Sequence, residues 1–182
     1  MISLNLYFIF IQFIGFLAWF LLAVSYYRKD TDRILSVQLV ANILFCLHYF
    51  LLGAYSGLLI CVYDVLRDYL YYKTDKDNYI FVGSLVIYFI SSVLTYTSLL
   101  DLFPYLASLI DGFFLTKKRV VVVFGAIITY TLWLLYDLYA LSYSGAITDA
   151  IIIISNIYIL LFRKTESKII RGRRIYFKNR SF

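Results

Sequence analysis

The sequence of 182 residues has little charge, little proline and few side chains that bind metals or protons. Charged residues make up 15% of it, against about 25% in a typical soluble domain, and there are one proline, one histidine and two cysteines. Hydrophobic residues make up 63%, and no Gly/Ser-rich linker divides the chain. This composition excludes a disordered chain and favours one polytopic membrane domain.

Common catalytic and cofactor motifs are also missing. The sequence has no Gly-rich phosphate loop, H-E-x-x-H, G-x-S-x-G or paired-cysteine motif. With one histidine and one arginine well inside an apolar run, a nucleophile–base pair or a metal site is hard to build. Cys46 and Cys61 both lie within apolar runs, which indicates small buried residues and not a disulfide or a zinc site. We therefore expect no enzymatic activity, no metal and no cofactor.

What the sequence does contain is a series of long apolar runs. Since a membrane-spanning helix needs about 20 apolar residues, we predict seven helices, at about 6–27, 34–52, 57–72, 79–98, 102–116, 120–140 and 146–162. Asp101 and Pro104 suit the first turn of the fifth helix. The first 27 residues lack a basic start and a cleavage-like site, so this helix is expected to be retained. The expected fold is all-α, with one transmembrane domain over 1–162 and a basic cytoplasmic tail over 163–182.

The basic residues indicate how such a domain is oriented. All 17 Lys and Arg fall in four clusters between or after apolar runs, at 28–33, 67–76, 117–119 and 163–180. This distribution argues against nucleic acid as the reason for the net charge of +6. With seven spans and the N-terminus outside, all four clusters face the cytoplasm, as the positive-inside rule requires. The six-span alternative omits the third or the fifth helix and places one cluster outside.

Two short connections suggest an internal repeat. Tyr-Ser-Gly occurs at 55–57 and again at 143–145, and the same offset pairs Asp68 with Asn156 and Lys29 with Lys117. Together with similar helix lengths and charge clusters, this predicts two three-helix units, at about 6–72 and 102–162. Because one linker helix at 79–98 intervenes, the two units would share one orientation in the membrane.

The most unusual stretch is the apolar hairpin from Gln38 to Asp68. Its polar residues are Gln38, Asn42, His48, Asp64, Arg67 and Asp68. An ionisable side chain inside a membrane is costly and is functional by default. Asp64, Arg67 and Asp68 share one helix face through their i, i+3, i+4 spacing. They fit either a self-neutralising ion pair that lets the helix insert, or a gate or binding site.

The second half of the chain carries acids that have no basic neighbour in sequence. These are Asp111, Asp137 and Asp149. No Lys or Arg occurs between Arg119 and Arg163, so some carboxyls must be protonated or face water unless Arg67 serves several of them. The interior of the bundle is therefore expected to be acidic or proton-binding, with Asp64 and Asp149 at similar depth on a shared central path.

The remaining candidates have structural explanations as well as functional ones. Asn42 and Asn156 suit hydrogen bonding between membrane helices. His48 fits a buried packing residue, or a proton or substrate contact near the outer end of its helix. Trp133 precedes Asp137 by one turn, which suits a flat or cationic ligand or an ordinary tryptophan of the interfacial belt.

Several short motifs resemble the YgjV-like family of bacterial inner-membrane proteins. They are His48-Tyr49-Phe50-Leu51-Leu52-Gly53-Ala54 followed by Gly57 and Arg67, Phe103-Pro104, Trp133 with Asp137, and Gly145-x3-Asp149-x6-Asn156. The resemblance covers nearly the whole chain and implies a multi-pass inner-membrane location, but no substrate. It also implies Asn and Glu where this sequence has Asp137 and Asp149. The 3-1-3 layout is similar to that of PnuC vitamin transporters and SWEET sugar facilitators, an analogy of fold only.

These observations favour a transporter or facilitator of a small polar metabolite, cationic or nucleoside- or vitamin-like, with the lipid bilayer and a small-molecule ligand as partners. The candidate substrate-binding residues are Gln38, Asn42, His48, Asp64, Arg67, Asp111, Trp133, Asp137, Asp149 and Asn156. The alternative is a non-transporting scaffold or accessory subunit, in which the same residues only hold helices together. The number of copies is left open, a homo-oligomer included.

Overall fold

The computed structural model describes residues 6–25, 31–74, 77–114 and 119–162. All regular secondary structure in these ranges is helical. The elements in chain order are α1 (Leu6–Ser25), α2 (Thr31–Leu52), α3 (Tyr55–Lys73), α4 (Asp77–Thr95), the 3-10 helix η1 (Leu99–Leu102), α5 (Phe103–Phe114), α6 (Arg119–Tyr139) and α7 (Tyr143–Phe162). The predicted all-α class and the seven helices are confirmed. The predicted basic tail at 163–182, with Lys29 and Lys117, lies outside the described residues, as do the side chains of Gln38 and Asp68.

Several helix boundaries differ from the prediction by two or more residues. The fourth helix ends at Thr95 and not near 98, because Ser98 and Asp101 form a capping box that starts η1. Asp101 therefore caps η1, while Pro104 lies in the first turn of α5. Tyr-Ser-Gly forms the first residues of α3 and α7, and the turns themselves lie just before it.

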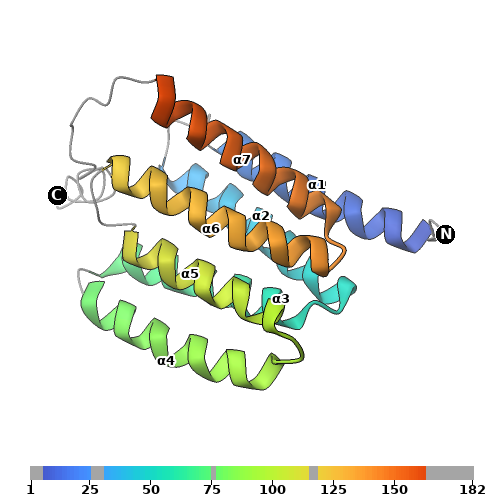
Figure 1. Cartoon of the computed structure of the whole chain (residues 1–182), viewed down its shortest axis with the longest axis horizontal. Coiled ribbons are helices and arrows are strands. Elements are labelled where there is room, and N and C mark those ends of the chain that lie inside the picture. The colour runs from blue at the N-terminus through green and yellow to red at the C-terminus, as the bar shows by residue number, and fades with distance from the viewer. Residues whose placement is uncertain (1–5, 26–30, 75–76, 115–118, 163–182) are drawn as a thin grey trace.

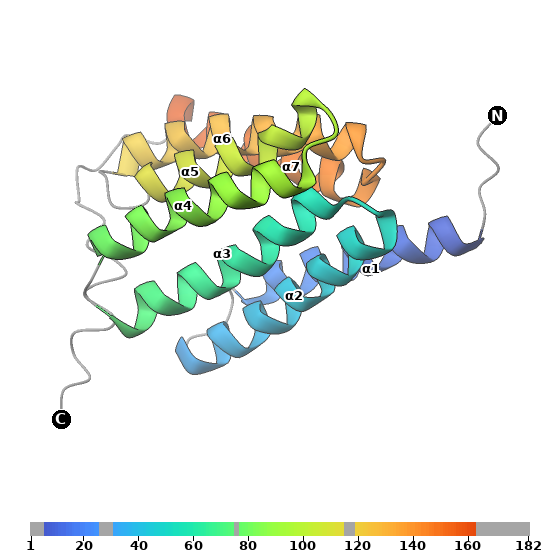
Figure 2. The same cartoon turned by 90° about the horizontal axis from the view of Figure 1, so that it is seen from below.

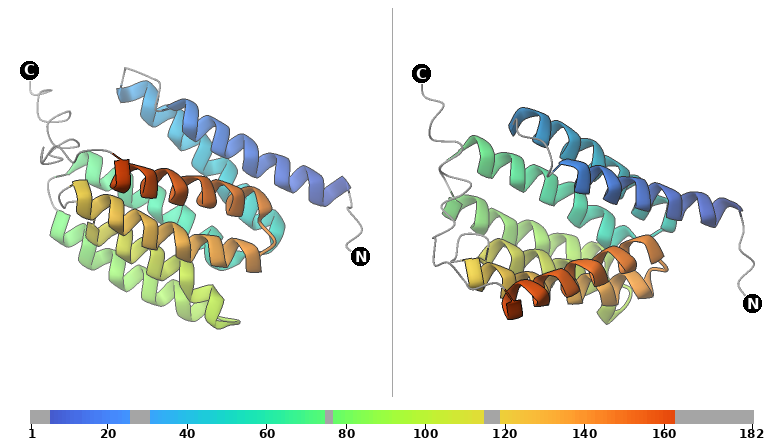
Figure 3. Two further views of the ribbon diagram at one scale, coloured as in Figure 1. Left: turned by 45° about the horizontal axis from the view of Figure 1, so that its top comes forward. Right: turned by 90° about the horizontal axis from the view of Figure 1, so that it is seen from above.

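The helices form an up-and-down bundle along one long axis (Figure 1). α1 begins at the end of the bundle where the α2–α3 and α6–α7 turns lie, which we call the turn end, and α7 ends at the opposite end. α1 packs against α2 and α7, while α5 packs against α6, α3 and α4. Figures 2 and 3 show that α4 lies on the side of the bundle away from α1, against α3 and α5.

The distribution of polar and apolar side chains is the reverse of that in a soluble protein. Large apolar side chains cover the outside, among them Phe13, Phe89 and Ile154, which are 62%, 70% and 67% exposed. Charged and polar groups such as Arg67 and Asp137 are buried, at 3% and 1% exposed. Lipid accepts an apolar surface, while polar groups must be satisfied inside the bundle. The fold therefore suits a bilayer.

Length and apolarity identify two helices of the described chain as able to cross a membrane. They are Val120–Tyr139 and Tyr143–Leu161, while the apolar stretches Leu6–Leu21, Leu39–Leu52 and Tyr79–Thr95 are shorter. α5 has 12 residues and is about 18 Å long at 1.5 Å per residue, less than the ~30 Å of a bilayer core. Seven helices are thus observed, whereas seven spans remain a prediction.

Candidate functional site

The interior polar residues form two separate hydrogen-bond networks. The first, which we call the clamp, joins α3, α4 and α5 and consists of Asp64, Arg67, Tyr88, Ser108 and Asp111. The second, which we call the junction, joins α1, α2, α6 and α7 near the turn end. Hydrogen bonds and ring contacts connect Gln12, His48, Tyr49, Tyr136, Asp137, Ser142 and Ser144, and Asp149 lies within reach of the Asp137 charge. Predicted site residues occur in both networks.

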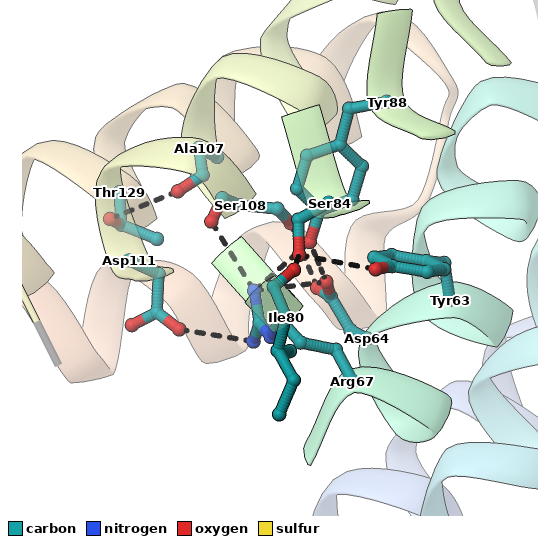
Figure 4. A network of polar contacts seen from close by, with 10 residues as sticks. All are labelled: Tyr63, Asp64, Arg67, Ile80, Ser84, Tyr88, Ala107, Ser108, Asp111 and Thr129. Atoms are coloured by element: carbon teal, nitrogen blue, oxygen red, sulfur yellow. Dashed lines mark hydrogen bonds and ion pairs between the residues drawn. The ribbon is translucent and has the colours of Figure 1, made fainter. Parts of the chain in front are cut away.

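Arg67 is the centre of the clamp (Figure 4). Its guanidinium lies 3.2 Å from Asp64 Oδ1 and 3.3 Å from Asp111 Oδ2. It also donates to the Tyr88 hydroxyl at 3.0 Å and to the Ser108 carbonyl at 3.3 Å. The planar guanidinium suits several fixed acceptors at once. One arginine therefore serves two carboxylates and ties α3 to α4 and α5.

Both carboxylate oxygens of Asp64 accept hydrogen bonds within the clamp. Tyr88 donates to Asp64 Oδ1 at 2.5 Å, and the Ser108 hydroxyl donates to Asp64 Oδ2 at 2.8 Å (Figure 4). A neighbouring bond at 3.1 Å joins Tyr63 to Ser84 across the same helices. Because each oxygen of Asp64 has a partner, this network fits the self-neutralising role considered for Asp64 and Arg67.

The junction is organised around Asp137, which is 1% exposed. Tyr49 of α2 donates to Asp137 Oδ1 at 2.8 Å, so the bond connects the first half of the chain to the second. The Tyr49 ring stacks on Trp133, with ring centroids 6.0 Å apart and planes at 28°. Tyr136 meets the same tryptophan edge-on at 6.0 Å. The buried carboxylate is thus bordered by aromatic rings.

His48 continues this network towards α1. The imidazole is 1% exposed, and its Nδ1 lies 2.9 Å from the Ile11 carbonyl oxygen. Its Nε2 lies 2.9 Å from the Ser142 hydroxyl. Gly15, one turn after Ile11, makes this approach possible, because a Cβ there would lie 3.0 Å from the imidazole.

The turns at this end are held by side chains from the other half of the chain. Gln12 of α1 donates to the Leu141 carbonyl at 2.8 Å and accepts from the Ser144 amide at 2.9 Å. Conversely, the Tyr136 hydroxyl of α6 lies 2.8 Å from Ser56 Oγ and accepts from the Gly57 amide at 2.9 Å. Gly57 tolerates no Cβ, which would lie 2.8 Å from the Tyr136 ring. The turn end is therefore closed by bonds between the two halves.

Asp149 differs from every other buried acid of the described chain. It is 7% exposed, and its Oδ2 is a buried oxygen with no hydrogen-bond partner among the described residues. The charge of Asp137 acts on it from the neighbouring helix. Leaving a buried acceptor unpaired costs free energy, so such a group in a native protein calls for an explanation.

Asp101 lies in the short helix η1 between α4 and α5, at the turn end. Burial raises the pKa of its carboxyl, but hydrogen bonds from Thr97, Ser98 and Ser56 outweigh burial, so the pKa lies below the ordinary value for aspartate. Thr97 donates both its hydroxyl and its amide, at 2.5 and 3.0 Å. This acid is held ionised by neutral donors.

Comparison with known proteins places this architecture in a family. The profile of the Imp-YgjV family, described as a bacterial inner membrane protein, matches residues 9–167. The chain belongs to this family. No curated protein and no solved structure matches the chain at a significant level. The inner-membrane setting of the Imp-YgjV family agrees with the apolar outer surface, and the resemblance read from the sequence is confirmed.

Some predicted site residues of this Imp-YgjV protein belong to neither network. Asn42 is half-buried in α2, and the Asn156 amide donates to the Ile152 carbonyl of its own helix at 2.9 Å. Asp64 and Asp149, which were expected on one path, belong to different networks: the first to the clamp, the second to the junction. The shared path is a prediction that these contacts do not test.

Sequence reasoning missed the hydroxyl groups that complete both networks. Tyr49, Ser142 and Tyr136 of the junction and Tyr88 of the clamp were not singled out. One signal was present in the sequence, because Tyr49 precedes Asp137 by 88 residues, the offset of the Tyr-Ser-Gly repeat.

Proposed function

We propose that this Imp-YgjV protein transports a small polar, cationic metabolite across the inner membrane and binds it at the junction. The observation that carries the proposal is the unpaired, buried Oδ2 of Asp149 beside Asp137. The hydrogen bonds described above for the junction involve no Lys or Arg. Two buried acids without a Lys or Arg partner attract a cation, since a cation supplies the missing charge and a hydrogen-bond donor.

The aromatic rings beside these acids narrow the class of ligand. Trp133 and Tyr49 present stacked faces within about one helical turn of Asp137. Aromatic faces attract cations electrostatically, at about 0.5–2 kcal/mol each depending on desolvation, and stack on flat rings. A flat or ring-bearing cation therefore suits the junction better than a free metal ion or a sugar.

The symmetry of the packing supports a transporter built from two three-helix units. A shift of 88 residues relates α1, α2 and α3 to α5, α6 and α7. The packing within the two units corresponds: α1 packs on α2 as α5 packs on α6, and α2 packs on α3 as α6 packs on α7. The packing between the units corresponds as well, since α1 contacts α7 and α5 contacts α3. Within the described ranges, positive φ occurs at Gly53 (72°) and Leu141 (58°), and these positions are related by the same shift. Leu141 adopts a conformation that is uncommon outside glycine, as the corresponding turn requires.

The bonds across the turn end follow the same relation. Tyr49 and Asp137 are equivalent positions, and they bond to each other. Ser56 pairs with Tyr136, while the equivalent Ser144 lies 3.5 Å from His48, the equivalent of Tyr136. Equivalent residues meet in this way near a two-fold axis. The junction therefore lies where the proposed units meet, the place where transporters with parallel repeats bind their substrates.

The orientation we propose places the turn end outside the cell and the C-terminus in the cytoplasm. Arg33, Lys73 and Arg119 all belong to helix ends at the opposite end of the bundle, as the positive-inside rule favours for the cytoplasmic side. The short α5 would rely on local thinning of the bilayer or on its neighbours α3, α4 and α6. A reporter that functions only in the cytoplasm should be active when it is fused after Phe182. If only a reporter that functions in the periplasm is active there, this orientation is rejected.

A ligand screen on the purified full-length protein tests the transport proposal. A cationic ring compound should raise the melting temperature, because a ligand that binds only the native state stabilises it. Asp149→Asn should weaken that ligand at least about tenfold, the loss of about 1.4 kcal/mol. Asp64→Asn is the matched control, and it should leave affinity unchanged. Equal loss in both variants, or full affinity and uptake in Asp149→Asn, would remove Asp149 from the site.

The second candidate function is a scaffold or accessory subunit. It is favoured by the clamp, in which both oxygens of Asp64 already have partners, and by Asn156, which bonds within its own helix. If no compound shifts the melting temperature and Asp149→Asn only stabilises the protein, the scaffold becomes the better explanation.

A further inference from the structure

The turn end of the bundle is closed by hydrogen bonds between the two halves of the chain. They join Tyr49 to Asp137, Gln12 to the turn before α7, and Tyr136 to the start of α3, and they are 2.8, 2.8 and 2.9 Å long. Asp149 lies deeper in the bundle, as the seventh residue of α7. A ligand on Asp149 is therefore separated from the turn end by a layer of bonds that cross from one half to the other.

Burial along α7 changes at Asp149. Six of the eight residues at 142–149 are buried, whereas none is buried at 150–161. In α1, which packs on α7, the last buried side chain among those described is Ala18. The stretch of α3 equivalent to 150–161 differs, because it contains the buried residues Tyr63 and Arg67, which bond to α4 and α5. α7 is thus tightly packed only between Asp149 and the turn end.

Two asparagines that belong to neither network lie in the loosely packed part. Asn156 is seven residues beyond Asp149 in α7, and Asn42 is six residues before His48 in α2, so at 1.5 Å per residue both lie about 9–11 Å from the junction, away from the turn end. Both side chains are half-buried. A polar amide is unfavourable against lipid alone, so this pair suits a path that water reaches.

We propose that the turn end is an outer gate, which this structure shows closed, and that water and ligand reach Asp149 from the cytoplasmic end, between α1, α2 and α7. This inference rests on the transport function proposed above and describes how access to that site is regulated. The bond between Tyr49 and Asp137 is the central part of the gate, because it joins equivalent positions of the two halves and must break when the halves part. Release of a ligand to the outside then requires the gate to open.

Cysteine labelling from the cytoplasmic side tests the inner path. The full-length protein, with Cys46→Ala and Cys61→Ala to remove its own thiols, is exposed in inverted membrane vesicles to a maleimide that does not cross membranes. Because the reactive thiolate forms in water and not in lipid, Asn156→Cys should react at least about tenfold faster than Ile154→Cys. Ile154 is the matched control, since it is 67% exposed but on the outer, lipid-facing side of the same helix. Equal rates, or a faster reaction of Ile154→Cys, would overturn the inner path.

Labelling from the outer side, in cells with a permeabilised outer membrane, tests the gate. Ser144→Cys, at a position that is 1% exposed, should react slowly, and adding Tyr49→Phe should raise its rate about fivefold, the effect of one hydrogen bond on the population of the open state. Tyr88→Phe is the matched control, because Tyr88 also donates to an aspartate but within the clamp, and it should leave the rate unchanged. Ser56→Cys replaces Ser144→Cys as the reporter if the latter does not fold.

Two results would overturn the gate. One is fast labelling of the outer reporter without Tyr49→Phe, and the other is an equal increase from Tyr49→Phe and Tyr88→Phe. The labelling uses no ligand, whereas the screen on Asp149→Asn depends on one. Failure of the gate and failure of the cation site are therefore separate results.

Discussion

The clamp and the junction both contain two acids, yet only the clamp contains an arginine that pairs with them. In the clamp, Arg67 lies between Asp64 and Asp111, and each oxygen of Asp64 accepts a hydrogen bond. In the junction, Asp137 and Asp149 are buried more deeply, and one oxygen of Asp149 has no partner among the described residues. The clamp satisfies itself, whereas the junction is satisfied only by something added, such as a proton or a cation.

This contrast separates two uses of buried charge in a membrane protein. A self-contained network fixes helices relative to one another, and removing one member exposes the others to the full cost of unpaired burial. An incomplete network costs stability in the resting protein, and natural proteins keep such costs at functional positions. Removing a charged side chain should therefore destabilise the clamp, whereas removing the unpaired acid Asp149 should not destabilise the junction.

The largest loss of stability is expected from Arg67→Met. It leaves the acids Asp64 and Asp111 without their base in the interior, at a cost of about 3 kcal/mol, the lower end for a broken buried pair because both acids are partly exposed. The free energy of unfolding in mixed detergent micelles measures it.

The double variant Arg67→Met with Asp64→Asn is the control for this prediction. It removes one of the unpaired charges together with the base, so it should recover about 1 kcal/mol of the loss if the two residues are coupled. Strict additivity of the two single effects would show that the ion pair contributes nothing to stability.

A somewhat smaller loss is expected from Gly145→Ala in the junction. The added Cβ would collide with the Asp137 carboxylate and the Ser142 hydroxyl, so the network must shift, at a cost of about 2 kcal/mol for overpacking. Gly83→Ala is the matched control, because nothing lies within 4 Å of its Cβ and alanine favours helix by up to about 1 kcal/mol. Melting temperatures of the two variants should move in opposite directions, and a Gly145→Ala protein as stable as wild type would contradict the close contact.

The sequence predicts the helices of this protein well, because each long apolar run has only one stable form in a bilayer. It also points to most of the interior acids, since a charge in an apolar run stands out. Even the early end of α4 had a local signal: Ser98 and Asp101 have the spacing of a capping box.

The partners of those acids could not be predicted in the same way. Arg67 meets Asp111 across 44 residues of sequence, and Tyr49 meets Asp137 across 88. These pairings depend on which helices are neighbours, which the apolar pattern does not specify when every helix is apolar on most of its surface. Only the 88-residue repeat carried long-range information, and it relates Tyr49 to Asp137 correctly as equivalent positions.

The smallest expected effect concerns Asp101, which tests whether lack of a base is enough to define a functional acid. Asp101 also has no Lys or Arg among the partners described above, but hydrogen-bond donors from Thr97, Ser98 and Ser56 satisfy its carboxylate. Its pKa is lowered in the folded protein, so the stabilisation is present above the unfolded pKa of about 4 and is lost as the pH falls through the lower folded value. Asp101→Asn should cost about 1 kcal/mol of unfolding free energy at neutral pH, as for a lost cap, and should flatten the fall in melting temperature in acid.

Ser98→Ala is the control for this prediction. It removes the side chain that accepts from the Leu100 amide but keeps the Asp101 carboxylate, so it should lower stability and preserve the dependence of melting temperature on acid pH. Ligand affinity should be unchanged in both variants. Loss of affinity in Asp101→Asn would show that a fully bonded acid can also belong to the site, and the distinction between complete and incomplete networks would fail as a guide to function.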